Sequence, residues 1–172
     1  MLGVMYAPNS QVTLMGMTSY LKKDMKHVTF MGPMGTNRLG TFSTQTSGVG
    51  DTSLSVLIKI GDEHTSRWHA TMGFSLPTGS IDESATILTP INTQPNPRLP
   101  YPMQLDSGTY DLIAGLTYAD STGRWAWGSQ WRSVIRLGEN DEHYTLGDVH
   151  RLSGWLSHRL GNRVSVSGRL EY

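Results

Sequence analysis

Apolar and polar residues alternate with a period of two along most of the chain. Positions 52, 54, 56, 58 and 60 hold Thr, Leu, Val, Ile and Ile, and Ser53, Ser55 and Lys59 lie between them. After a short polar stretch, Trp, Ala, Met, Phe and Leu occupy alternate positions from 68 to 76. Successive side chains of a β-strand point to opposite faces. Each segment therefore predicts a strand with one apolar and one polar face.

Eight such strands can be placed along the sequence, and the connections between them are in turn short and long. The predicted strands are 1–6, 11–21, 48–60, 67–77, 108–118, 125–137, 146–158 and 163–172. The short turns are 7–10, 61–66, 119–124 and 159–162, and the long connections are 22–47, 78–106 and 138–145. Five prolines in 78–106 exclude a regular helix or a strand ladder there.

Short turns at one end of the strands and long connections at the other are typical of an outer-membrane β-barrel. The predicted strand lengths suit a bilayer, which a tilted strand of about 9–11 residues spans. Two interfacial aromatic girdles are expected, with Trp68, Tyr118, Trp125 and Trp127 near the short turns and Tyr20, Tyr110 and Tyr172 at the opposite ends. We therefore predict an all-β fold, an antiparallel up-and-down transmembrane β-barrel. The alternative is a soluble β-sandwich or lipocalin-like barrel that buries the apolar face.

Composition narrows the classes of function. The net charge is zero and 16% of the residues are charged, so the chain lacks the basic excess of a nucleic-acid-binding protein. Cysteine is absent, which excludes thiol catalysis, disulfides and cysteine-ligated metals. No nucleophile elbow, zinc-protease motif or phosphate-binding loop occurs, so we expect neither an enzyme nor a cofactor. The six histidines and many serines still leave open a Ser–His pair formed in space.

The two ends of the chain indicate a piece of a larger barrel. Residues 1–6 lack the basic region and the cleavage site of a signal peptide, although an outer-membrane protein has to be exported. Residues 163–172 alternate up to the last position. We expect residues 1–172 to form one partial domain, about eight strands of a barrel of about twelve.

Four segments resemble a known protein family. They are Ser47–Asp51, Ser75–Asp82, Leu99–Thr109 and Arg136–Asp141. In this order they resemble the bacterial outer-membrane β-barrel proteins catalogued as transporters of the meta-pathway of phenol degradation. The resemblance extends over almost the whole chain and implies a longer protein with a signal peptide and further strands. It assigns no reaction, no substrate and no functional residue to this chain.

If the apolar face meets lipid, the polar face lines the lumen of the barrel. The predicted lumen residues are Asp51, Lys59, Arg67, His69, Asp111, Gln130, Arg132, Arg136, Arg151, Arg169 and Glu171. Antiparallel pairing about the turn 119–124 would place Asp111 opposite Arg132. Arginine outnumbers the acidic residues in this set, which predicts a mild preference for anionic solutes.

The long connection 22–47 contains four candidate metal ligands, Met25, His27, Met31 and Met34. Thioether and imidazole groups suit Cu(I), and a loop would allow them to converge on one ion. Their spacing matches no strict ligand motif, so simple packing within the loop is the alternative interpretation.

We expect the protein to let small, aromatic or otherwise hydrophobic molecules pass through the bacterial outer membrane. The long connection 78–106 is the candidate for a constriction or lid, because long loops tend to have functional roles. The expected partners are outer-membrane lipid and the solute, and the oligomeric state stays open. Two other classes remain, a non-transporting barrel that binds copper or a partner through its loops and a soluble β-domain that binds a ligand.

Overall fold

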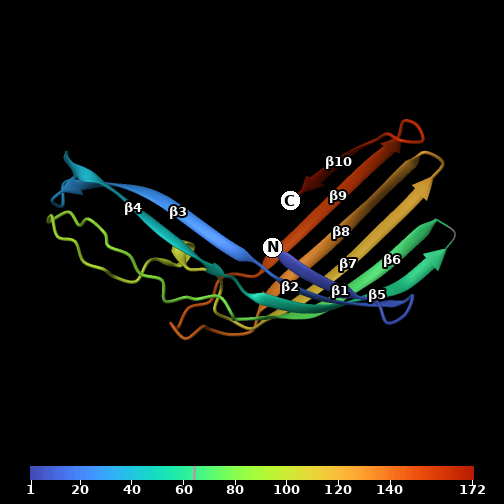
Figure 1. The fold of residues 1–172 in the computed structure, drawn as a ribbon, viewed down its shortest axis with the longest axis horizontal. Helices are drawn as coiled ribbons and strands as arrows, with labels where there is room; N and C mark the ends of the chain where they lie inside the picture. Colours follow the sequence, from blue (N-terminus) through green and yellow to red (C-terminus); the bar gives the residue numbers. More distant parts are fainter. Residues whose placement is uncertain (64) are drawn as a thin grey trace. The chain divides into compact units, whose positions relative to one another are not determined.

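The computed structural model of the chain describes residues 1–63 and 65–172 and confirms an all-β fold (Figure 1). In this described part the strands are β1 (Leu2–Tyr6), β2 (Val12–Thr18), β3 (Tyr20–Met31), β4 (Asn37–Val49), β5 (Thr52–Glu63), β6 (Ser66–Leu76), β7 (Asp111–Thr122), β8 (Trp125–Arg136), β9 (Val149–Arg159) and β10 (Ser165–Glu171). A short 3-10 helix, η1, spans Tyr101–Met103. Among the described residues, no helix is long and apolar enough to cross a membrane.

The chain forms two compact units, each built from separate segments. The sheet unit consists of residues 2–17, 53–76 and 109–172. The hairpin unit consists of residues 18–52 and 77–108, together with Met1. The sequence predicted a single partial domain, and the two units are described separately below.

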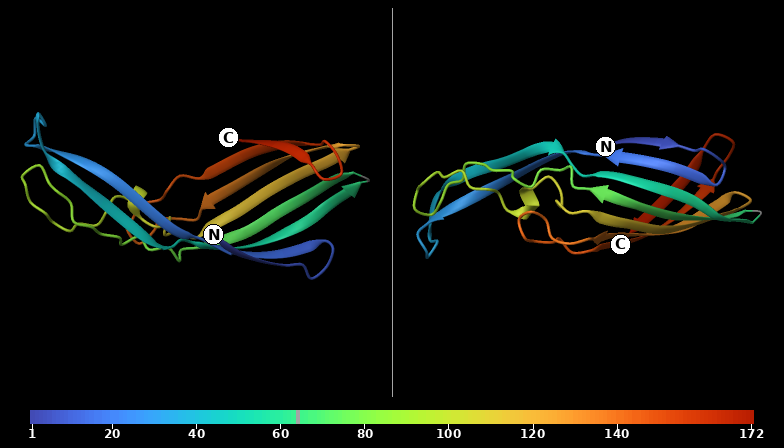
Figure 2. Two further views of the ribbon diagram at one scale, coloured as in Figure 1. Left: turned by 45° about the horizontal axis from the view of Figure 1, so that its top comes forward. Right: turned by 90° about the horizontal axis from the view of Figure 1, so that it is seen from below.

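The sheet unit contains one eight-stranded sheet in the order β1-β2-β5-β6-β7-β8-β9-β10. Its strands lie side by side in each view, with β1 and β2 at one edge and β10 at the other (Figures 1 and 2). The strands predicted from alternation are found here, with ends that differ by a few residues. Strands β1 and β10 do not pair, so the sheet is open and these residues alone do not close the predicted barrel.

The connections of this sheet are short at one end of the strands and long at the other. Short connections follow β1, β5, β7 and β9, and longer chain segments follow β2, β6 and β8. The predicted turn 61–66 includes residue 64, which lies outside the described residues. The alternation of connection lengths that the sequence predicted is therefore present in the sheet.

The hairpin of β7 and β8 has a tighter turn than the sequence predicted. Thr122 pairs with Trp125, so the turn has two residues, and its first residue, Gly123, has a φ of +57°. A positive φ at this position suits glycine and a primed β-turn, whose twist matches that of the strands. The predicted turn 119–124 was too long, and the register shifts by four residues. Asp111 consequently pairs with Arg136, and the prediction that it lies opposite Arg132 was wrong.

The connection 22–47 is part of a β-hairpin, and the prediction of a loop was wrong. Strands β3 and β4 pair along their whole length, with one register shift after Thr29. The loop was predicted because the segment is polar, and residues 43–47 are an uninterrupted run of Ser, Thr and Gln. Threonine is β-branched and favours strands. Thr44 and Thr46 are indeed almost fully buried in β4.

The proline-rich connection 77–108 packs along this hairpin within the same unit. Thr29 Oγ1 donates a hydrogen bond of 2.8 Å to Leu88 O, and Thr46 Oγ1 donates one of 2.8 Å to Met103 O. The buried apolar side chains of the connection are Ile81, Leu99, Met103 and Leu105. The connection is therefore an ordered layer against the hairpin and not a free lid.

Gln104 holds the connection 77–108 together from within. Its side chain is 1% exposed, and its Nε2 donates hydrogen bonds to Leu99 O at 2.6 Å and Glu83 O at 3.2 Å. Its Oε1 accepts a hydrogen bond of 2.9 Å from Glu83 N. One buried amide thus satisfies three backbone groups of an irregular segment, as buried polar backbone requires.

The variant Gln104→Leu is expected to loosen this segment. It leaves Leu99 O and Glu83 N without the partner that Gln104 supplies, whereas Glu83 O keeps its hydrogen bond from Leu99 N. The loss of a partner costs about 1–3 kcal/mol for each buried group. Limited proteolysis within 77–108 should then become at least about tenfold faster, while the sheet unit stays protected. The exposed Gln94 of the same segment supplies the control Gln94→Leu. Equal cleavage rates in the two variants would contradict the proposed role of Gln104.

Candidate functional site

The register of the sheet unit gives each of its faces a distinct chemistry. Directly paired residues share a face, so the apolar face can be followed from β6 to β10 through the pairs Trp68–Tyr118, Leu116–Trp131, Trp131–Leu152 and Leu156–Gly168. The same face holds the alternate apolar residues of β2 and β5, such as Leu14 and its partner Val56. No described Lys or Arg side chain of the sheet lies on this face, and Asp120 is its one described carboxylate.

The apolar face is open to the surroundings of the unit. Met72 is 60% exposed, Phe74 55%, Leu152 56% and Leu156 51%. Within the sheet unit, Ile113 is the buried apolar residue, and it lies on the opposite face. A soluble β-sandwich covers its apolar face with a second sheet. No second layer covers this face within the described sheet unit, so the sandwich alternative has no support here.

Aromatic side chains gather on the apolar face beside the short turns. Trp68 and Tyr118 lie 4.7 Å apart between ring centroids, and Trp125 and His158 lie 4.1 Å apart. These rings match the first of the two predicted girdles. The second girdle does not form one row in the sheet. Tyr172 exchanges hydrogen bonds with Leu152, and this row continues through Trp131 to Leu116, six residues from Tyr110 along the chain.

The polar face holds ten of the eleven residues that the sequence assigned to the lumen. They are Lys59, Arg67, His69, Asp111, Gln130, Arg132, Arg136, Arg151, Arg169 and Glu171. The strand period alone brings them together, since each is an even number of residues from the next along its own strand. The face therefore has the charged composition of a surface in contact with water.

Asp51 is the exception, because it lies between β4 and β5 in the hairpin unit. Its carboxylate accepts hydrogen bonds of 2.9 Å from Gly79 N and from Ser107 Oγ, and its own N–H donates to Asp106 Oδ2 at 2.8 Å. Burial raises the pKa of the Asp51 carboxyl above its usual value, and the neighbouring Asp106 carboxylate raises it further. Asp51 thus joins both ends of the connection 77–108.

A buried ion pair fixes one end of the hairpin of β7 and β8. Arg136 Nη1 contacts Asp111 Oδ2, and the side chains are 12% and 2% exposed. Thr109 Oγ1 donates a hydrogen bond of 2.6 Å to Asp111 Oδ1. The carboxylate therefore has a cation and a hydroxyl as partners, which a buried charge requires.

Two hollows lie on the polar face and share Gln130 and Arg132. The smaller, of about 150 Å³, is lined by Gln130, Arg132, Arg151, Ser153, Arg169 and Glu171. The larger, of about 280 Å³, is lined from β1 through β8 by residues that include Met5, Met15, Met17, Leu57 and His69. This hollow therefore extends over six neighbouring strands of the sheet, from β1 to β8.

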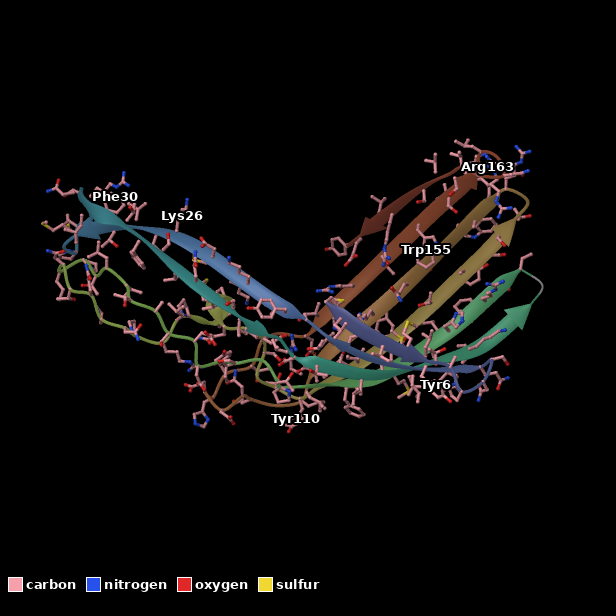
Figure 3. All side chains as sticks on the ribbon, in the orientation of Figure 1. Tyr6, Lys26, Phe30, Tyr110, Trp155 and Arg163 are labelled. Atoms are coloured by element: carbon pink, nitrogen blue, oxygen red, sulfur yellow. The ribbon has the colours of Figure 1, made fainter. Side chains whose placement is uncertain are left out.

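Trp155 also lies on the polar face, among the charged residues, at the position labelled in Figure 3. It pairs with Gly128, where an added Cβ would lie 2.3 Å from the indole ring. Arg169 lies over the ring at 5.9 Å from the ring to the guanidinium carbon. The two-residue period of the strand places Trp155 on the same face as Arg151 and Ser153. Its contact with Gly128 depends on the register of β8 and β9, which the sequence did not determine.

The four candidate copper ligands do not lie in a loop. Met25, His27 and Met31 belong to β3, and Met34 follows it. A strand rises about 3.3 Å per residue, so Met25 and Met31 are about 20 Å apart along it. His27 Nε2 lies 3.1 Å from Thr44 Oγ1, and its ring stacks on Phe42. The premise that all four side chains converge on one ion is therefore not met.

The ion pair can be tested by a double-mutant cycle. Arg136→Gln leaves the buried Asp111 carboxylate without its cation and should destabilise the protein by about 3–5 kcal/mol. Asp111→Asn/Arg136→Gln retains neutral hydrogen-bonding groups and should lose clearly less than the sum of the single variants. Urea unfolding followed by circular dichroism measures both. Additive losses would show that the two side chains act independently.

The raised pKa of Asp51 predicts an unusual pH dependence of the hairpin unit. The folded state binds the proton more tightly than the unfolded state, so stability falls as the pH rises from the usual pKa of aspartate, about 3.9, through the folded pKa. Hydrogen exchange of 77–108, corrected for intrinsic rates, should show this fall in the wild type and not in Asp51→Asn. Asp82→Asn, an exposed change in the same segment, should keep the fall. A rise with pH would contradict the prediction.

Comparison with known proteins identifies the family of the chain. No curated protein matches the chain. A family profile matches residues 26–172, far more than half of the chain, and this family is described as "Putative MetA-pathway of phenol degradation". The chain belongs to this phenol-degradation family, as the sequence segments indicated.

Proposed function

We propose that the sheet unit is part of the wall of an outer-membrane β-barrel through which small molecules pass. The observation that supports this most is the exposed apolar face, which has no lysine or arginine among the described residues of the sheet, while the opposite face is rich in them. Exposed apolar patches of this extent mark a surface that something covers. Lipid suits this face because apolar residues occupy it on every strand from β2 to β10. Transmembrane barrels alternate apolar residues outward with polar residues inward.

The dimensions of the strands agree with a bilayer. Strands β7 and β8 have 12 residues each. At about 3.3 Å per residue they extend about 40 Å. With the tilt of about 45° usual in membrane barrels, this length spans about 28 Å, close to the hydrocarbon thickness. The aromatic rings of Trp68, Tyr118 and Trp125 then lie at one lipid–water interface.

The polar face would line the passage, where water solvates its charges. Positive charges predominate there. Asp111 and Arg136 neutralise each other, which leaves Glu171 as the one acidic residue of the predicted lumen set on this face. The positive residues of that set are Lys59, Arg67, Arg132, Arg151 and Arg169. A lumen with an excess of cations lowers the electrostatic barrier for anions. The family name points to phenol degradation, and aromatic or other hydrophobic compounds are the solutes that we propose.

A Ser–His pair does occur on the sheet, but its geometry favours a structural role. Ser133 Oγ lies 2.6 Å from His150 Nδ1, on the apolar face beside Trp131 and Leu152. A lipid hydrolase would need such a pair at such a face. A nucleophile also needs access to its substrate, whereas Ser133 is 0% exposed. We therefore propose passage of solutes and not catalysis.

Substitution on the two faces of one strand tests whether the apolar face meets lipid. Met72→Arg should destabilise the barrel by about 2–4 kcal/mol, because arginine on the lipid face of a barrel is costly. On an exposed protein surface in water the same change costs within about 0.5 kcal/mol. The neighbouring change Thr71→Arg places the charge on the polar face and should be tolerated.

The measurement uses the full-length protein, expressed from its complete reading frame, in outer-membrane fractions. Boiled and unboiled samples are compared by gel electrophoresis, since a folded barrel migrates differently after heating. We expect a heat-dependent shift for the wild type and Thr71→Arg, and its loss or weakening for Met72→Arg. Planar bilayers then test passage directly as ion conductance. A soluble wild type without a mobility shift would contradict the proposal.

A further inference from the structure

Two arginines are held directly opposite each other on the polar face of the sheet. Arg132 of β8 pairs with Arg151 of β9 in the register of the ladder. Directly opposed residues have Cβ atoms about 4.5–5.5 Å apart, and like charges at this distance are destabilising. Both residues are exposed to solvent, and an anion bound between the two guanidinium groups would relieve the remaining repulsion.

The protein itself supplies little of that compensation. Glu171 is the one carboxylate of the smaller hollow, and its Oε1 lies 3.9 Å from Arg151 Nε, with both side chains more than half exposed. Such a solvated pair contributes about 0–1 kcal/mol. Arg169 Nη2 donates a hydrogen bond of 2.9 Å to Ser153 Oγ and does not meet a carboxylate of its own. In the part of the chain that the structure describes, the guanidinium group of Arg132 makes no hydrogen bond or ion pair with another residue.

The hollow that adjoins this arginine cluster is apolar on its far side. Met5, Met15, Met17 and Leu57 line it, and Gln130 and Arg132 line both hollows. Methionine is flexible and polarisable, so it adapts to apolar ligands of varied shape. Methionine on the polar face is also unexpected. If this face only lined a water-filled lumen, polar side chains would be expected at these positions.

We propose that the two hollows form one binding site for a small amphiphilic anion, such as a monocarboxylate with an apolar body. The carboxylate would lie against Arg132 and Arg151 in the smaller hollow. The apolar body would lie against Met5, Met15 and Met17 in the larger hollow. This inference deepens the proposed function and rests on it, because it names the class of solute that the passage selects.

The volumes agree with this class of ligand. The smaller hollow, about 150 Å³, holds a carboxylate together with the waters that solvate the arginines. The larger, about 280 Å³, lies just below the usual range of ligand pockets, about 300–1,000 Å³, which suits a small ligand. A neutral hydrocarbon leaves the arginine pair uncompensated, and a bare inorganic anion leaves the methionines in water. Both should therefore bind less tightly than a molecule with both parts.

Calorimetric titration of the full-length protein in detergent micelles tests the proposal with three ligands. Sodium hexanoate has both parts, sodium acetate has the charge without the body, and 1-hexanol has the body without the charge. With empty micelles as the reference, hexanoate should bind at least about tenfold more tightly than either of the others. Because calorimetry needs no conductance, this result is independent of the bilayer measurement.

Two variants and a matched control test which hollow binds the carboxylate and which binds the apolar body. Arg132→Gln should weaken hexanoate and acetate by about tenfold, the usual loss for a charged hydrogen bond. Met15→Gln should weaken hexanoate and leave acetate unchanged. Arg163→Gln removes the same charge from the exposed turn after β9, labelled in Figure 3, and should change neither ligand.

Equal affinities for hexanoate and acetate, or equal effects of Arg132→Gln and Arg163→Gln, would overturn the proposal and show only a general attraction for anions. In that case a heat-dependent mobility shift and conductance would still support the proposed passage. Their absence would instead reject the proposed function, whatever the calorimetry shows. Selective binding of hexanoate, lost in Arg132→Gln, would support the inference.

Discussion

The structure depends on the coupling between the hydrogen-bonded ladder and the two-residue period of the side chains. In an antiparallel sheet the register decides which residues are paired, and paired residues share a face. A slip of one residue would send every apolar side chain to the polar face, among them Met72 and Leu116. The eight-stranded sheet keeps both faces distinct from β2 to β10, although neither face is covered by another layer of its unit. Register is therefore the constraint that gives the sheet an apolar side and a charged side.

The same coupling explains why the buried groups of the sheet unit lie where they do. Asp111 and Arg136 are brought together only because the turn between β7 and β8 has two residues, with Gly123 at a positive φ. The pair is buried on the polar face, next to Ser75, which pairs with Asp111, and to Ile113, two residues further along β7. The turn and the ion pair support one register, since a slip of even one residue would separate the charges and leave Asp111 without its cation.

The sequence predicted the faces of the strands well because period two is a local property. The period can be recognised without knowing which strands pair. Ten of the eleven residues that the sequence assigned to the lumen therefore lie on the polar face. Properties that depend on partners were predicted poorly. The register of β7 and β8 was four residues off because the turn length was unknown. The two hollows, and the contact of Trp155 with Gly128, also depend on how the strands are paired and could not be derived from spacing.

The hairpin unit was missed for a different reason. Its strands bury Thr44 and Thr46 in place of large apolar residues, and the segment that covers them is irregular and rich in proline. Hydroxyl groups replace apolar contacts there, for example from Thr29 to Leu88 O. A search for hydrophobic alternation does not detect strands of this kind, whose covered face is satisfied by hydrogen bonds. Asp51 was assigned to the lumen because residues 48–60 were predicted as one strand. In the structure β4 ends at Val49 and β5 begins at Thr52, so Asp51 lies between two strands.

The distribution of tryptophan over the two faces provides an intrinsic fluorescence probe for each face. Of the five tryptophans, Trp68, Trp125, Trp127 and Trp131 share the apolar face, and Trp155 alone lies on the charged face. Indole emission depends on the polarity around the ring, and a quencher reduces it only from the side that it can reach. A quencher dissolved in lipid and one dissolved in water would therefore act on different members of this set. The part of the fluorescence that Trp155→Phe removes would report on the polar face of the sheet, without any dye attached to the protein.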